Sequence, residues 1–90
     1  MMVRLRIDGQ VQGVAYRAWA VREALRLGLA GWVRNRRDGS VEMVLCGDDG
    51  DVEAMIARCR QGPRMAQVDS IRQEAEDTAP EPGFRQLPTV

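Results

Sequence analysis

The segment from Gly9 to Arg17, GQVQGVAYR, carries the clearest chemistry in the sequence, because it joins an alternating apolar run to a helix-like run. The first backbone N–H groups of a helix lack internal partners and carry the positive end of its dipole. Gly13 lets such a backbone approach an anion closely, and Arg17 in the first helical turn can add a bidentate contact. The segment therefore predicts an anion cradle, although an ordinary connection with a solvent-facing arginine has the same pattern. Gln12 and Tyr16 are more typical of packing or surface groups than of ligands.

Asn35 is the second candidate, because asparagine is a poor strand residue yet ends the strand-like run GWVRN before a turn. Its side chain fits two roles. It can form the turn, or it can lie near the cradle and position a water molecule. Since the sequence contains no histidine, a neutral amide there would orient the water rather than deprotonate it.

Missing residue types narrow the chemistry further. The chain has no histidine and no lysine, so all 13 basic side chains are arginines. This excludes imidazole bases, Schiff-base lysines and the phosphate-binding lysines of Walker type. Every fixed positive side chain is instead a planar guanidinium, whose geometry matches phosphate and carboxylate. Cys46 and Cys59 are far apart and have no histidine beside them, which argues against a zinc site and predicts reduced, partly buried thiols.

Length and charge indicate one small domain over residues 1–90 without a general affinity for polyanions. Ninety residues, of which 44% are hydrophobic, are enough for a single core. The 13 basic and 13 acidic side chains cancel, so no overall field favours nucleic acid or a membrane surface. No apolar run approaches about 20 residues, and the first residues show no signal-peptide pattern. We expect a cytoplasmic protein that contacts no membrane, and a monomer by default for so short a chain.

Periodicity predicts the elements that position these groups. Residues 3–7 alternate apolar and polar side chains, as a half-buried strand does. Residues 17–29 change to helical spacing and end near Gly28. Strand-like runs at 31–35 and 41–46 flank a turn and predict a hairpin. The apolar stripe expected along the helix consists of Ala18, Val21, Ala24, Leu25 and Gly28 or Leu29.

The second half of the sequence supplies a further helix and the remaining strands. A loop at 47–51 precedes helical spacing that Gly62-Pro63 stops. Val68 and Ile71 are three residues apart, so a strand over 65–74 requires a bulge, and residues 83–87 form a short closing strand. The order strand, helix, strand, strand, helix, strand is the split βαβ arrangement of ferredoxin-like domains. We predict an α+β fold, a ferredoxin-like α/β sandwich (βαββαβ) with two helices on one face of an antiparallel sheet.

Two segments together resemble the signatures of the acylphosphatase family. The first signature, G-x-V-Q-G-V-x-F/Y-R, is matched from Gly9 to Arg17. The second runs G-F/Y/W-V-K/R-N, three residues, G-x-V, five residues, G, and is matched from Gly31 through Asn35 to Gly47. The similarity in layout covers about residues 3 to 87, and the family's ferredoxin-like fold agrees with the order of elements above.

The resemblance implies hydrolysis of a carboxylic-phosphoric mixed anhydride to a carboxylate and inorganic phosphate, with no metal and no organic cofactor. It implies that Arg17 and loop amides bind the phosphoryl group while Asn35 positions the attacking water. Such chemistry needs positioning and charge stabilisation more than a strong base. The resemblance also implies that a phosphate oxygen of the substrate takes the proton of the water. The loop residues whose backbone amides are implicated are Gln12, Gly13, Val14, Ala15 and Tyr16.

Some positions depart from the family pattern. Trp19 is bulky for the first turns of a helix and is expected to pack in the core. After Phe84 the family alternates apolar and polar residues, whereas Gln86 and Leu87 break this alternation. The sequence therefore does not decide the extent of the last strand.

Two other function classes compete at this level. A non-catalytic anion-binding or regulatory module would use the same fold and cradle. Nucleic-acid binding would use the arginines at 34, 36 and 37 beside Trp32, although neighbouring arginines in a turn are usually a solvated face. The same arginines adjoin Asn35, where they would attract an anionic substrate.

Overall fold

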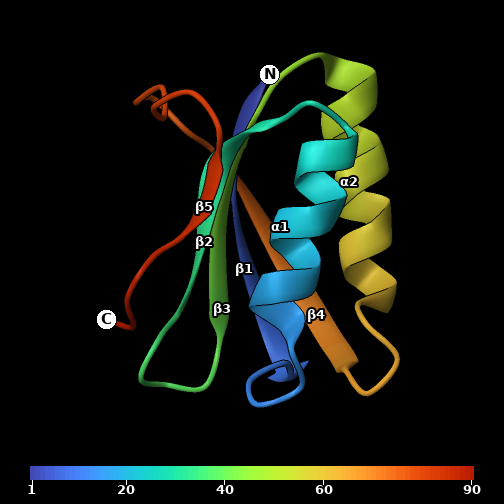
Figure 1. Ribbon diagram of the computed structural model, residues 1–90. Helices are drawn as coiled ribbons and strands as arrows, with labels where there is room; N and C mark the ends of the chain where they lie inside the picture. The colour runs from blue at the N-terminus through green and yellow to red at the C-terminus, as the bar shows by residue number, and fades with distance from the viewer.

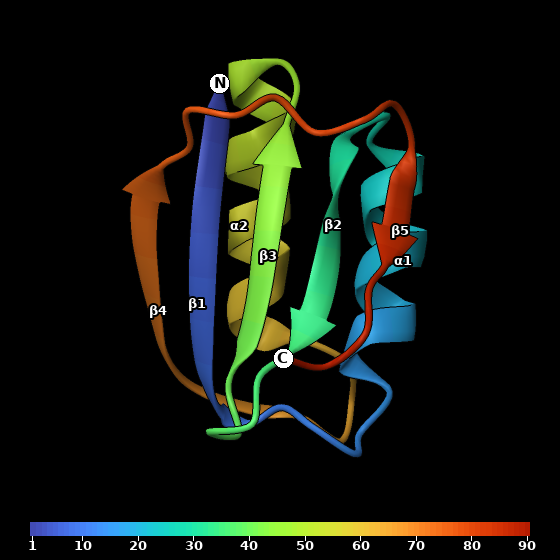
Figure 2. The same cartoon turned by 90° about the vertical axis from the view of Figure 1, so that its left-hand side faces the viewer.

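Alternating apolar residues build a five-stranded sheet with two helices on one face and nothing on the other (Figures 1 and 2). The computed structural model describes residues 1–90, the whole sequence. The elements, in chain order, are β1 (Met2–Gln10), α1 (Tyr16–Arg26), β2 (Ala30–Asn35), β3 (Val41–Cys46), α2 (Asp49–Gln61), β4 (Gln67–Ala75) and β5 (Phe84–Gln86).

The strand order β4-β1-β3-β2-β5 confirms the ferredoxin-like prediction and corrects one feature of it. The first four strands pair antiparallel, but β5 runs parallel to β2. The sheet is therefore mixed rather than wholly antiparallel. The reason is that the chain leaves β4 at one edge, crosses the end of the sheet and enters the far edge in the same direction as β2 (Figure 2).

The core lies between the sheet and the helices. The inward-facing positions of β1 and β3 are fully apolar, and α2 contributes a buried stripe. Outward positions of the same strands carry charge, as Arg4 and Arg6 do on β1. The main buried residues are Val3, Leu5, Ile7, Val41, Met43, Leu45, Val52, Met55, Ile56 and Cys59.

Helix α1 ends where the sequence predicts but is rotated from the expected orientation. Its end at Gly28 is a Schellman motif, in which Gly28 N–H donates to the Leu25 carbonyl and Leu29 N–H to the Ala24 carbonyl. The predicted stripe is wrong at two positions, since Ala18 and Leu25 are exposed. Ala24 is buried as predicted, and the other buried positions of the helix are Tyr16 and Ala20. The large Tyr16 side chain enters the core at the start of the helix, and this fixes the rotation.

The bulge predicted for the fourth strand is confirmed. The register between β1 and β4 pairs Asp8 with Ser70 and then Gly9 with Val68, so Asp69 is the extra residue. Because of it, Val68 and Ile71 both pack against the core although they are three residues apart. Neither helix is long and apolar enough to cross a membrane.

We predict that Gly31→Ala destabilises the fold. A methyl group at this position would lie 1.9 Å from the Val44 carbonyl oxygen, and the φ of +145° disfavours any side chain. The free energy of unfolding should fall by about 2 to 4 kcal/mol in urea titrations. Gly50→Ala in α2 is the control, because its added methyl meets nothing and should change stability by less than about 1 kcal/mol. Equal effects of the two substitutions would contradict this account of Gly31.

Candidate functional site

The loop between β1 and α1 presents unpaired backbone N–H groups. Ala15 stands at the N-cap position of α1, where its methyl side chain makes no capping bond. The first helical bond runs from Trp19 N–H to the Ala15 carbonyl, and no backbone N–H of residues 12–18 donates to another protein atom. These donors therefore remain free for a ligand.

The loop backbone is bent sharply at two places. Gly13 has a φ of 76°, and Ala15 has a φ of 62° and is the one non-glycine residue in the left-handed region. That region costs an alanine about 1 kcal/mol or more, and residues held in it often mark functional sites. The left-handed conformation of Ala15 is thus an unfavourable local conformation that accompanies the sharp bend of the loop.

A cavity of about 160 Å³ brings the loop together with the end of β2. Both the loop and the hairpin after β2 lie at the same end of the molecule, the lower end in Figures 1 and 2. The cavity collects most of the residues that the sequence singles out, but not Val14, which packs against the core instead. The lining residues are Val11, Gln12, Gly13, Ala15, Tyr16, Arg17, Ala18, Asn35 and Gln86.

Arg17 is the free cation of this cavity. Four other arginines are similarly shielded from solvent, and all of them make ion pairs with carboxylates: Arg4, Arg6, Arg34 and Arg36. Arg17 lines the cavity and makes neither an ion pair nor a hydrogen bond with the protein. A half-buried guanidinium without a partner is suited to an anionic ligand.

Asn35 lies at the C-terminal end of β2 and also has unmet hydrogen-bonding capacity. Its side-chain oxygen Oδ1 is buried without a partner, which is uncommon for a buried polar atom. The backbone is fixed, since the Asn35 carbonyl accepts a hydrogen bond of 3.1 Å from Val90 N–H. Asn35 therefore lines the cavity while its side-chain oxygen is used by no donor of the protein.

Gln12 ties the loop to the hairpin, a role that the sequence does not reveal. Its Nε2 donates to the carbonyl oxygens of Arg36, at 2.7 Å, and Ser40, at 2.8 Å. Gln86 is a second residue of the cavity that the sequence does not indicate as a site residue. It pairs with Val33 across β5 and β2, so its side chain shares the face of Val33 and reaches the cavity. Both contacts join segments far apart in sequence, and no local pattern signals them.

Tyr16 and Cys59 are structural and supply no acid or base. The Tyr16 hydroxyl donates to the Cys59 carbonyl at 2.7 Å. Burial raises the pKa of Tyr16 far above its ordinary value and that of the Cys59 thiol to about 12. Both stay neutral near pH 7. Both cysteines are free thiols, as predicted, and side chains suited to metal binding do not gather in groups of three or more.

Two of the three arginines near Trp32 are engaged on the open face of the sheet, whereas Arg37 is exposed and makes no ion pair. Arg34 and Arg36 both pair with Glu42. The Arg34 guanidinium lies 4.6 Å from the centre of the Trp32 ring, and that of Arg4 lies 5.7 Å from it. Trp32 therefore has two guanidinium groups near its ring, each of which also pairs with Glu42.

Comparisons with known proteins point to one family. The family model described as Acylphosphatase matches residues 3–86. The acylphosphatase of Nitrobacter hamburgensis is 53% identical, covering 93% of this chain and 91% of that protein. That of Rhizorhabdus wittichii is 54% identical, covering 97% and 88%. The crystal structure of acylphosphatase from Bacillus subtilis matches with a TM-score of 0.90 at 30% identity, covering 96% of this chain and 97% of that one. These matches include both segments that line the cavity.

We predict that Gln12→Ala weakens the binding of inorganic phosphate to the cavity. Loss of two hydrogen bonds, each of about 1 kcal/mol, frees the loop from the hairpin and loosens the arrangement of its amides. Calorimetric titration should give a dissociation constant about three- to tenfold higher. Gln10→Ala, in an exposed residue at the end of β1, is the control and should leave affinity unchanged. Unchanged affinity in Gln12→Ala would show that the tether does not shape the cavity.

Proposed function

Because this chain belongs to the acylphosphatase family and is an enzyme that hydrolyses acyl phosphates, we propose that the cavity at the start of α1 is its active site. The observation that carries the proposal is that one cavity is lined by a loop with free amides, by the unpaired guanidinium of Arg17 and by Asn35, whose buried amide oxygen has no partner. These three features come from two segments that are separate in the sequence, and each lacks a partner within the protein.

The phosphoryl group of the substrate is bound by the loop. Backbone N–H groups of Gln12, Gly13, Val14, Ala15 and Tyr16 donate to its oxygens, aided by the positive end of the α1 dipole. Arg17 adds a charge-assisted contact in which two guanidinium N–H groups meet two phosphoryl oxygens. Donors placed in advance stabilise the charge that spreads over the equatorial oxygens in the transition state.

Asn35 positions the attacking water. Its Oδ1 accepts a hydrogen bond from the water, so the water oxygen faces the phosphorus in line with the departing carboxylate. An amide cannot remove the proton, and the residues around the cavity include no carboxylate or thiol. The proton passes to a phosphoryl oxygen of the substrate itself, and the P–O bond to the carboxylate breaks as water adds.

The size of the cavity indicates where substrate recognition lies. About 160 Å³ accommodates a phosphoryl group and its water but little of an acyl group. The acyl part therefore extends toward solvent, and the phosphate end dominates recognition. The reaction uses water and groups of the chain alone, without a metal or an organic cofactor.

Arg17→Ala should abolish most turnover of benzoyl phosphate. The expected loss in kcat/KM is at least about 100-fold, because a fixed positive charge is removed from the transition state. Arg17→Lys keeps the charge but cannot make the bidentate contact, so its kcat/KM should lie between those of wild type and Arg17→Ala. Arg22→Ala, an exposed arginine of the same helix without an ion pair, is the control and should retain full activity. An Arg17→Ala variant as active as wild type would refute the proposed site.

Asn35→Ala should lower kcat by about 100-fold while leaving inhibition by inorganic phosphate unchanged, because water placement is lost and the loop is intact. Steady-state kinetics with phosphate as competitor separate the two effects. Saturable phosphate binding with undiminished turnover would remove Asn35 from the mechanism. A parallel rise in the phosphate inhibition constant would instead assign Asn35 to binding.

A further inference from the structure

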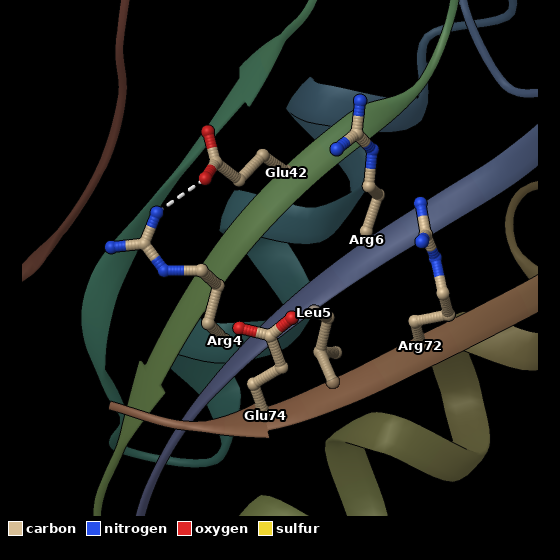
Figure 3. A pocket seen from close by; sticks show the side chains of 6 residues that line it. All are labelled: Arg4, Leu5, Arg6, Glu42, Arg72 and Glu74. Atoms are coloured by element: carbon tan, nitrogen blue, oxygen red, sulfur yellow. Dashed lines mark hydrogen bonds and ion pairs between the residues drawn. The ribbon is translucent and has the colours of Figure 1, made fainter.

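Glu42 occupies the centre of the open face of the sheet. It lies in β3, between β1 and β2, and is the direct cross-strand partner of both Arg6 and Arg34. Its neighbours Val41 and Met43 point into the core, so its own side chain points away from the helices. Even there the side chain is only 7% exposed. In Figure 3 the carboxylate extends over the sheet toward Arg4, away from Arg6 and Arg72.

Three guanidinium groups surround this carboxylate. Oε1 accepts from Arg34 Nε at 2.7 Å and from Arg36 Nη1 at 3.0 Å, while Oε2 pairs with Arg4 Nη1. Burial alone would raise the pKa of Glu42, but the hydrogen bonds from Arg34 and Arg4 outweigh it and hold the pKa below its ordinary value. Glu42 is therefore ionised near pH 7 and locks the arginine side chains that it contacts.

Two of these arginines are the immediate neighbours of Asn35 in the chain. Residues alternate in direction along β2, so Arg34 reaches the open face while Asn35 lines the cavity. Arg36 follows the end of β2 and reaches the open face as well, where it pairs with Glu42. One carboxylate oxygen thus fixes the residues before and after Asn35. The backbone at Arg36 is held in addition by its N–H bond to the Ser40 carbonyl, at 2.9 Å, and by Gln12.

We propose that Glu42 is a positioning residue for hydrolysis, which clamps Arg34 and Arg36 and thereby sets the placement of the Asn35 amide on the other face of the sheet. The inference rests on the proposed function of Asn35. Glu42 touches neither substrate nor water, because the sheet separates it from the cavity. Its effect is mechanical: a reacting group displaced by about 1 Å can cost up to about 100-fold in rate.

A double-mutant cycle tests this role. Glu42→Gln keeps the shape of the side chain but removes its charge, and should lower kcat for benzoyl phosphate by about tenfold with an unchanged inhibition constant for phosphate. In the Asn35→Ala background the same substitution should change kcat by less than about twofold, because there is no amide left to position. A general loss of stability would instead lower activity equally in both backgrounds, and that result would overturn the proposal.

Matched variants keep the test decisive if Glu42→Gln folds poorly. Arg36→Gln removes one arm and leaves Glu42 paired with Arg34 and Arg4, so it should show the same pattern in the cycle. Glu74→Gln, an exposed neighbour on the open face without an ion pair (Figure 3), should leave kcat unchanged. Full activity of Glu42→Gln together with low activity of Asn35→Ala would refute the role of Glu42 and leave the proposed function of Asn35 intact. Full activity of Asn35→Ala would refute both this role and the proposed function of Asn35.

Discussion

The chain must leave backbone N–H groups free at the start of α1 and still hold them in place, and the architecture of this end of the molecule follows from that constraint. A serine or aspartate at the N-cap would satisfy these donors from within. The position is held by Ala15, which cannot cap and adopts a left-handed conformation. The donors that remain free lie beside the unpaired Arg17, and in the proposed mechanism they bind the phosphoryl oxygens of the substrate.

The two faces of the sheet contribute different parts of this arrangement. On the helix side, Tyr16 passes from the loop into the core and bonds the end of α2 through the Cys59 carbonyl, so the start of α1 is anchored from below. On the open side, a network of arginines around Glu42 holds the hairpin strand. Gln12 then joins loop and hairpin directly. The proposed placement of a water molecule depends on such connections, because the residues that line the cavity include no strong base.

The fold could be predicted from local pattern, and so could most of the residues that line the cavity. Alternation in residues 3–7, the turn before β3 and the three-residue spacing of Val68 and Ile71 are properties of neighbouring residues, and each was confirmed. The predicted orientation of α1 was wrong because helical spacing does not show that the side chain of Tyr16, rather than that of Leu25, is buried in the core. The bonds of Gln12 to the hairpin, the pairing of Gln86 with Val33 and the contact of Glu42 with Arg4 join residues far apart in the sequence. The parallel pairing of β5 depends on a crossing over the end of the sheet. Such contacts are decided by tertiary structure, which no single segment encodes.

The central claim is that loop amides, Arg17 and Asn35 converge on one phosphoryl group. Titration of the ¹⁵N-labelled protein with inorganic phosphate, followed residue by residue by NMR, tests it most directly. The account predicts that the backbone amides of residues 12–17 and the side-chain amide of Asn35 shift together along one saturable curve. Shifts confined to the open face around Arg6 and Arg72, with the loop unmoved, would contradict it.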